Sequence, residues 1–137
     1  GIVTALRLRE QERGLVHLVE SDHRKCAFLR EVSRETQAPV EVHRGRIEEI
    51  LPDLPEVDAI SARALASMAT LVEMTLERIE KGAVGVFLKG QDVGAELTKM
   101  PIYSSLKLRL VASRTDPLGR IVMLGRTDQA LTGGVGQ

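Results

Sequence analysis

Residues 15–25, LVHLVESDHRK, form a short apolar strand pattern that ends in one carboxylate and continues directly into a charged helix start. Ligands of open α/β sheets bind at the carboxyl ends of parallel strands. A carboxylate at such a strand end can accept hydrogen bonds from both hydroxyl groups of a nucleoside ribose. We therefore predict a ribose-binding role for Glu20. A solvated charge that simply ends a strand is the alternative.

The composition is that of one globular domain without a strong overall charge. Hydrophobic residues make up 43% of the 137 positions and charged residues 28%, which is sufficient for a buried core. Nineteen basic residues balance nineteen acidic ones, so any nucleic-acid contact must depend on a local basic patch. We expect neither a membrane segment nor a signal peptide. Cys26 is the single cysteine, which excludes an internal disulfide and agrees with a reducing cytoplasm.

Helix and strand patterns alternate along the chain, which predicts a mainly parallel α/β sheet. Helices are expected over residues 1–10, 22–37, 47–51 and about 67–81. Residues 91–100 are expected to form a helix or a loop with helical character. Strands are expected over residues 14–20, 40–43, 57–62, 83–89, 106–112 and 121–124. The strand over 57–62 should be buried, and the last two strands flank a turn sequence at 116–119, so they should pair as an antiparallel hairpin. We expect one partial domain over residues 1–128 and a disordered tail over residues 129–137.

Familiar catalytic motifs do not occur in the sequence. It contains no Walker loop, HExxH, GxSxG or cysteine–histidine cluster. His17, His23 and His43 fall on different predicted elements without a ligand-like spacing, so we expect no metal site. Cys26 is interpreted as a small hydrophobic residue.

Polar residues instead follow the ends of the predicted parallel strands. These are Glu20, Glu48, Arg63 and Lys89. Because parallel strands all point one way, the loops after them emerge on the same edge of the sheet. The four side chains are therefore expected to converge on one crevice that takes a nucleotide-like ligand.

Several of these segments, in this order, resemble the RsmG (GidB) family. They are VES at residues 19–21, RIEE at 46–49, ISARA at 60–64 and FLKG at 87–90. Members of this family are bacterial methyltransferases that use S-adenosylmethionine to methylate N7 of a guanine in 16S ribosomal RNA. The resemblance extends from Gly1 to about Arg126. It implies a Rossmann-like class I methyltransferase sheet, mainly parallel, with a C-terminal antiparallel hairpin.

The resemblance also implies a cofactor site for S-adenosylmethionine. Glu20 would hold the ribose hydroxyl groups, Ile47 and Glu48 would lie against the adenosine, and Arg63 would line the methionine end. Gly1 would be the last glycine of the family's glycine-rich loop, whose pattern is GxGxGxPG. No catalytic residue is assigned by this resemblance.

One departure from the family pattern concerns the start of the chain. The first strand of the sheet and the remainder of the glycine-rich loop have no counterpart in these 137 residues. Glycines of that loop let the backbone approach the cofactor closely. We therefore expect an N-terminally truncated fragment that lacks the first strand and is itself inactive. Lys89 matches a lysine of the family at a strand end, but no role is assigned to it.

The expected function is methylation of 16S rRNA in the cytoplasm by a monomer that contacts the small ribosomal subunit. Two alternatives stay open. An NAD-dependent Rossmann oxidoreductase would use a strand-end acid such as Glu20 for its own ribose. A non-catalytic RNA- or ribosome-binding module would use the basic residues Lys107, Arg109, Arg114 and Arg120, whose contacts with phosphate should weaken as salt rises.

Overall fold

The computed structural model describes residues 14–63, 66–101 and 103–131. The chain divides into two compact units, Gly1–Pro55 and Glu56–Gln137. The helix expected over residues 1–10 lies outside the described residues. The single partial domain expected over residues 1–128 stays a prediction.

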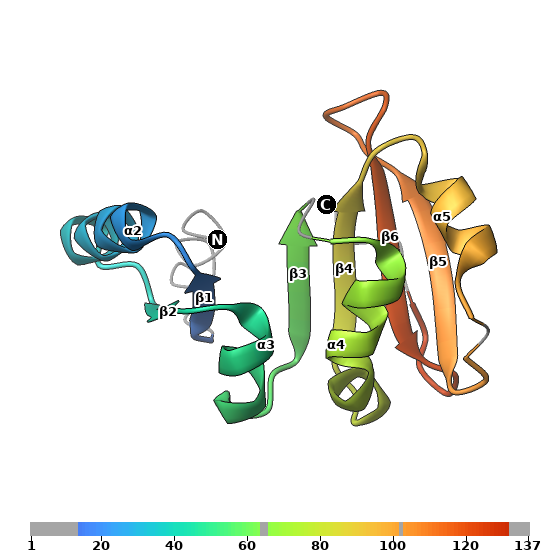
Figure 1. Ribbon diagram of the computed structural model, residues 1–137, viewed down its shortest axis with the longest axis horizontal. Coiled ribbons are helices and arrows are strands. Elements are labelled where there is room, and N and C mark those ends of the chain that lie inside the picture. Colours follow the sequence, from blue (N-terminus) through green and yellow to red (C-terminus); the bar gives the residue numbers. More distant parts are fainter. Residues whose placement is uncertain (1–13, 64–65, 102, 132–137) are drawn as a thin grey trace. The chain divides into compact units, whose positions relative to one another are not determined.

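The first unit contains a pair of parallel strands with a helix after each. In chain order its elements are β1 (Val16–Glu20), α2 (His23–Thr36), β2 (Val40–Arg44), α3 (Ile47–Ile50) and a short 3₁₀ turn, η1 (Leu51–Asp53) (Figure 1). The two strands pair in parallel, with Val16 opposite Val40 and Glu20 opposite Arg44. Helix α2 packs against both strands, as a parallel connection requires. The carboxyl ends of β1 and β2 therefore lie side by side.

Helix α2 begins where its capping residue predicts. The Asp22 carboxylate accepts hydrogen bonds from the backbone N–H groups of Arg24, at 2.8 Å, and Lys25, at 3.1 Å. Cys26 is fully buried, which confirms its interpretation as a small hydrophobic residue. Phe28, two residues further along the helix, is 67% exposed. Two helical steps rotate a side chain by about 200°, so burial of Cys26 places Phe28 on the opposite side of the helix.

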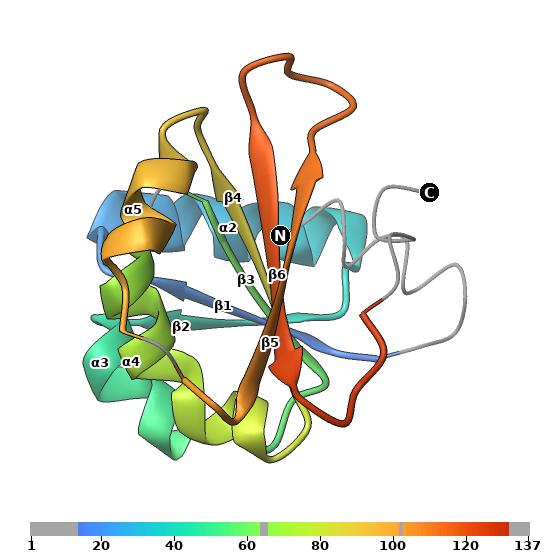
Figure 2. The ribbon, with the colours of Figure 1, turned by 90° about the vertical axis from the view of Figure 1, so that its right-hand side faces the viewer.

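The second unit is a mixed sheet. Its elements are β3 (Ala59–Arg63), α4 (Met68–Glu80), β4 (Val84–Lys89), α5 (Val93–Lys99), β5 (Leu106–Ala112) and β6 (Arg120–Arg126). Within the described residues the strand order is β3-β4-β6-β5. β3 and β4 are parallel, whereas β6 runs antiparallel to both β4 and β5, which confirms the predicted hairpin. Helices α4 and α5 lie on the same face of this sheet (Figure 2).

The core of this unit lies between α4 and the sheet. Its fully buried side chains are Met68, Leu71, Val72 and Ile79 from α4, Phe87 from β4, Val93 from α5, and Val122 and Leu124 from β6. Gly85 makes room for this packing, since a Cβ atom there would lie 2.8 Å from Cε2 of Phe87. The expectation of a buried strand over residues 57–62 is wrong. The side chains of β3 alternate between exposed and half-buried, because Ile60 and Ala62 pack against the core of this unit and the residues that alternate with them lie on the opposite face.

The segment after β6 packs on the second unit as far as residue 131, although disorder was expected from residue 129. Leu131 is buried, and its carbonyl accepts a hydrogen bond of 2.7 Å from Nη1 of Arg109. Nε2 of Gln129 donates to the Gly82 carbonyl at 3.2 Å. Residues 132–137 of the expected tail lie outside the described part. Among the described helices, none combines the length and the apolar character that a membrane crossing requires.

Candidate functional site

The backbone at the end of β1 is fixed to the turn that follows β2. The Gly45 N–H donates to the Glu20 carbonyl at 3.0 Å, and the thiol of Cys26 donates to the same oxygen at 3.1 Å. Gly45 has a φ of +152°, and a Cβ atom there would lie 3.0 Å from Cδ1 of Ile50. Both observations favour glycine at this position. The turn from β2 into α3 is therefore held directly beside Glu20.

Glu20 lies at the strand end, where the sequence predicts it. Its side chain is half-buried, and its Oε1 accepts a hydrogen bond of 3.3 Å from the backbone N–H of Asp22. A carboxylate has about four acceptor positions, so it can also accept hydrogen bonds from two neighbouring hydroxyl groups. This arrangement fits a ribose, and the role of Glu20 as a ribose ligand stays a prediction.

Two further predicted cofactor residues begin α3, which packs against β1. Ile47 is the first residue of the helix and is half-buried, whereas Glu48 is exposed. The structure thus brings Glu20, Ile47 and Glu48 to one end of the first unit. An apolar side chain and a carboxylate at adjacent positions could contact the face and the polar edge of a purine.

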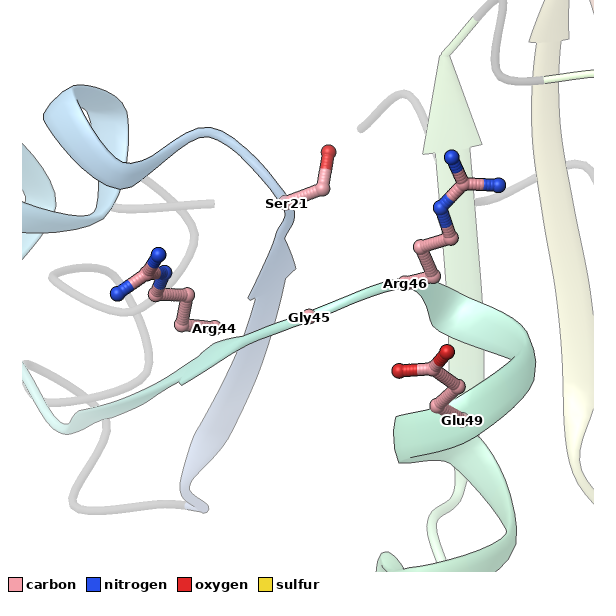
Figure 3. A pocket seen from close by; sticks show the side chains of 5 residues that line it. All are labelled: Ser21, Arg44, Gly45, Arg46 and Glu49. Carbon is pink, nitrogen blue, oxygen red and sulfur yellow. The ribbon is translucent and has the colours of Figure 1, made fainter.

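An open hollow of about 640 Å³ lies at this end of the first unit (Figure 3). Its lining residues are Ser21, Arg44, Gly45, Arg46 and Glu49. Figure 3 shows Ser21 on the turn after β1, facing the segment that carries Arg46 and Glu49. The predicted residues are the sequence neighbours of its lining residues and are not themselves in the lining.

In the second unit, Arg63 is the last residue of β3 and is exposed. It pairs with Leu88 and so lies beside the strand end that carries Lys89. Gly1 lies outside the described residues. That Glu20 and Glu48 of the first unit converge with Arg63 and Lys89 of the second stays a prediction.

Lys89 has a structural role that the sequence did not reveal. Its Nζ donates to the Ala66 carbonyl at 2.8 Å and lies 3.3 Å from Oε1 of Glu96, and its side chain is 11% exposed. The same Oε1 of Glu96 accepts the backbone N–H of Met68 at 3.1 Å. Lys89 therefore connects the end of β4 with α5, the start of α4 and the segment that follows β3.

Arginines of the basic hairpin form hydrogen bonds within the protein. Arg109 binds the Leu131 carbonyl, as described above. Nη1 of Arg120 donates to the carbonyls of Pro117, at 3.1 Å, and Gly119, at 2.8 Å. The contacts of Arg120 hold the hairpin turn, and the contact of Arg109 holds the segment after β6. Both arginines therefore have a structural role that does not depend on RNA binding.

Sequence reasoning missed the proximity of two histidines. Nδ1 of His17 lies 3.0 Å from Nε2 of His43. Of the two Glu41 carboxylate oxygens, Oε2 lies 3.9 Å from the His17 nitrogen and Oε1 lies 3.9 Å from the His43 nitrogen. The available signal was the Glu41-x-His43 spacing, which puts both side chains on one face of a strand. Bringing His17 to that face requires the register of β1 on β2, and no local pattern gives that register.

Comparison with known proteins gives related sequences for most of the chain. A family model described as "GidB: rRNA small subunit methyltransferase G" matches residues 1–113. Ribosomal RNA small subunit methyltransferase G of Methylobacterium radiotolerans is 45% identical over 123 residues, covering 89% of this chain and 57% of that protein. The protein of the same name from Methylorubrum extorquens strain PA1 is 42% identical over 122 residues, covering 89% and 58%. The chain therefore spans less than two thirds of these relatives.

Solved structures with a similar fold include the following two proteins. An rRNA methylase from Streptococcus thermophilus has a TM-score of 0.62 and 15% identity, covering 82% of this chain and 73% of that one. A mutant of MtNAS solved in complex with S-adenosylmethionine has a TM-score of 0.63 and 16% identity, covering 90% and 50%. At these identities the likeness concerns the fold, which is the Rossmann-like class I methyltransferase fold that the sequence predicts.

Proposed function

The chain belongs to the GidB family of rRNA small subunit methyltransferase G proteins, and from this premise we propose that it serves an S-adenosylmethionine-dependent methyltransferase that modifies N7 of a guanine in 16S rRNA. The observation that supports the proposal most directly is the backbone contact between the end of β1 and the turn after β2. There the Gly45 N–H binds the Glu20 carbonyl at 3.0 Å and holds a strand-end carboxylate beside the start of α3. This is the edge of an α/β sheet at which adenosyl ligands bind.

The residues of the first unit suit the adenosine half of the cofactor. Glu20 keeps acceptor capacity for two ribose hydroxyl groups besides its bond to the Asp22 N–H. Ile47 would pack against the adenine ring, and Glu48 would accept a hydrogen bond from a polar edge of the base. An open hollow, lined by Ser21 and Arg46 among others, lies beside these residues at the same end of the unit.

In the second unit, Arg63 would pair with the carboxylate of the methionine end. Lys89 would influence the position of the Arg63 side chain indirectly. Its Nζ binds the carbonyl of Ala66, which lies three residues after Arg63 in the chain. Gly1, by the family resemblance, would allow the backbone to approach the amino-acid part of the cofactor.

The chemical step requires alignment more than proton transfer. The cofactor supplies a methyl group on a sulfonium centre. The N7 lone pair of guanine needs no deprotonation, so a bond from N7 to carbon forms as the bond from carbon to sulfur breaks. What the protein residues must do is bind the adenosyl group, orient it and exclude water. We therefore propose no general base and no metal ion for this step.

A 16S rRNA substrate implies contact with the small ribosomal subunit and a cytoplasmic location, and we expect a monomer. The NAD-dependent alternative rested on the strand-end acid alone, which serves either cofactor. Because the family is a methyltransferase family, that alternative is set aside. The RNA-binding alternative is weakened by the internal hydrogen bonds of Arg109 and Arg120.

The proposal is tested by complementation. The whole gene that encodes this chain, and not the 137 residues alone, is expressed in a bacterium whose corresponding methyltransferase gene has been deleted. Borohydride reduction and aniline cleavage of 16S rRNA then report 7-methylguanine. We expect cleavage at one guanine with the wild type, and its loss with Glu20→Ala and with Arg63→Ala at equal protein levels. Persistent absence of the modification with abundant, folded wild-type protein would contradict the proposal.

A matched control is Glu35→Gln, which changes an exposed carboxylate on α2 away from the strand ends. It should leave methylation unchanged. If Glu20→Ala methylates as well as this control, the assignment of the ribose ligand is wrong even if the enzymatic activity is right.

A further inference from the structure

Three side chains on one face of the β1–β2 pair carry metal-ligating atoms. Alternate residues of a strand point to the same face, so Glu41 and His43 share a face of β2. The parallel register sets His17 opposite Glu41 and sets Val19 opposite His43. His17 therefore joins the other two on that face, and all three belong to the first unit.

The separations suit one small cation. Nδ1 of His17 and Nε2 of His43 are 3.0 Å apart, and each lies 3.9 Å from a carboxylate oxygen of Glu41. In tetrahedral coordination at Zn–N distances of about 2.0–2.1 Å, two ligand nitrogens are about 3.3 Å apart. The imidazoles already meet this spacing within a few tenths of an ångström. The two distances involve different oxygens, Oε2 towards His17 and Oε1 towards His43, so the carboxylate must turn as well as approach by about half an ångström, which the rotamers of an exposed glutamate permit.

The side chains of the three candidate ligands differ in their exposure to solvent. The side chains of His17 and His43 are 12% and 21% exposed, whereas that of Glu41 is 58% exposed. The two imidazoles are thus held in place by the sheet, and the third ligand faces solvent. An ion can enter from the side of Glu41 and keep water in a remaining position.

We propose that His17, Glu41 and His43 form a binding site for a divalent transition-metal ion of the zinc class. Neutral imidazoles and one carboxylate are the donor set that such ions take, with an open position for water. The ion would join β1 to β2 just before the strand ends at Glu20 and Arg44. This role is structural, and it is independent of the proposed methyl transfer.

Binding requires a change of tautomer and no redox step. In the ion-free pair, one imidazole N–H donates to the lone pair of the other ring across the 3.0 Å contact. To bind an ion, both facing nitrogens must present lone pairs. The donating ring moves its proton to its other nitrogen, so a neutral pair binds without net loss of a proton.

The test is a Zn²⁺ titration of the complete chain with its purification tag removed, after dialysis against EDTA. Competition with a chromophoric chelator gives the stoichiometry and the dissociation constant, and Co²⁺ absorption gives the coordination geometry. We expect one ion per chain with a tetrahedral Co²⁺ spectrum. Changes to groups around a metal site already cost about 10–100-fold in affinity, so His43→Ala should weaken binding at least about tenfold.

His23→Ala is the matched control, because His23 is the third histidine of the sequence and lies exposed on α2. It should bind Zn²⁺ as the wild type does. Glu41→Gln guards against a folding defect in the histidine variants, since its side chain is exposed, and it should weaken binding at least about tenfold too. The proposal is overturned if the wild type shows no saturable binding, or if His43→Ala and Glu41→Gln bind as tightly as His23→Ala.

Discussion

Replacement of Lys89 by methionine probes the contact network that holds the second unit together at the end of β4. Lys89→Met keeps most of the apolar stem of the side chain and removes the ammonium group. The Ala66 carbonyl then loses its donor at 2.8 Å, and Glu96 loses its cation at 3.3 Å. Glu96 keeps its bond to the Met68 N–H, so that carboxylate is not left without a partner.

The expected cost follows from the exposure of these groups. A hydrogen bond from a charged donor contributes about 1.5–3 kcal/mol. The side chain of Glu96 is 34% exposed, so the ion pair adds only about 0.2–1 kcal/mol, as for pairs open to solvent. We therefore expect the free energy of unfolding to fall by about 2–4 kcal/mol. With an m-value of about 1–3 kcal/mol/M, the urea midpoint should fall by about 1 M or more.

Lys81→Met is the matched control for this measurement. Lys81 forms an ion pair of 3.2 Å with Glu77 in the same unit, but the two side chains are 61% and 83% exposed. Its loss should cost no more than about 0.5 kcal/mol. Urea unfolding followed by circular dichroism compares the two variants. If both midpoints shift equally, the structural role assigned to Lys89 is refuted.

Three further predictions concern backbone positions and a helix cap. Gly45→Ala should lower the free energy of unfolding by about 1–3 kcal/mol in urea titrations, because φ is +152° there and a Cβ atom would lie only 3.0 Å from Cδ1 of Ile50. Gly85→Ala should cost about 1–3 kcal/mol by overpacking, since the new methyl group would meet the Phe87 ring at 2.8 Å. The Lys25 backbone N–H lowers the pKa of Asp22 below its ordinary 3.8. The charge of Asp22 therefore stabilises the fold at pH values above 3.8, and this contribution disappears as the pH falls through the lower folded-state pKa. Asp22→Asn should therefore lower Tm near neutral pH and should lower it less in acid.

The controls for these variants come from the same chain. A Cβ atom at Gly90 would have no neighbour within 4 Å, so Gly90→Ala should leave the urea midpoint close to that of the wild type. A Gly45→Ala or Gly85→Ala variant as stable as Gly90→Ala would contradict the corresponding argument. Glu35→Gln controls for the loss of one carboxylate, and a Tm difference for Asp22→Asn that does not shrink in acid would show that its charge is not the cause.

Local sequence signals predicted the elements well. The Asp22 cap fixes the start of α2, and the Ser67 hydroxyl accepts the Thr70 N–H to begin α4 as expected. The apolar segment before Lys89 became β4, which has a partner on each side among the described residues. Such signals act within a few residues along the chain, so the sequence alone is sufficient to locate them.

Features that depend on pairing between distant segments could not be predicted in the same way. Phe28 follows the helical period of α2, but the period does not specify which side of the helix packs on the strands. The contact of His17 with His43 requires the register of β1 on β2. The two partners of Lys89, the Ala66 carbonyl and the Glu96 carboxylate, come from two other segments of the chain. The residue type and its position at a strand end therefore suggested a ligand contact, whereas the structure has an internal contact.

The central claim is that an adenosyl group binds at the carboxyl ends of β1 and β2, where the Gly45 N–H donates to the Glu20 carbonyl, and that the Glu20 carboxylate is its ligand. Isothermal titration of S-adenosylmethionine into the protein expressed from its own gene, with Glu20→Gln beside Glu35→Gln, tests this most directly. Hydrogen bonds from ribose hydroxyl groups to a charged acceptor are worth about 1.5–3 kcal/mol, so Glu20→Gln should raise Kd by about 10–100-fold, while Glu35→Gln should match the wild type. Equal affinities for the two folded variants would contradict the claim.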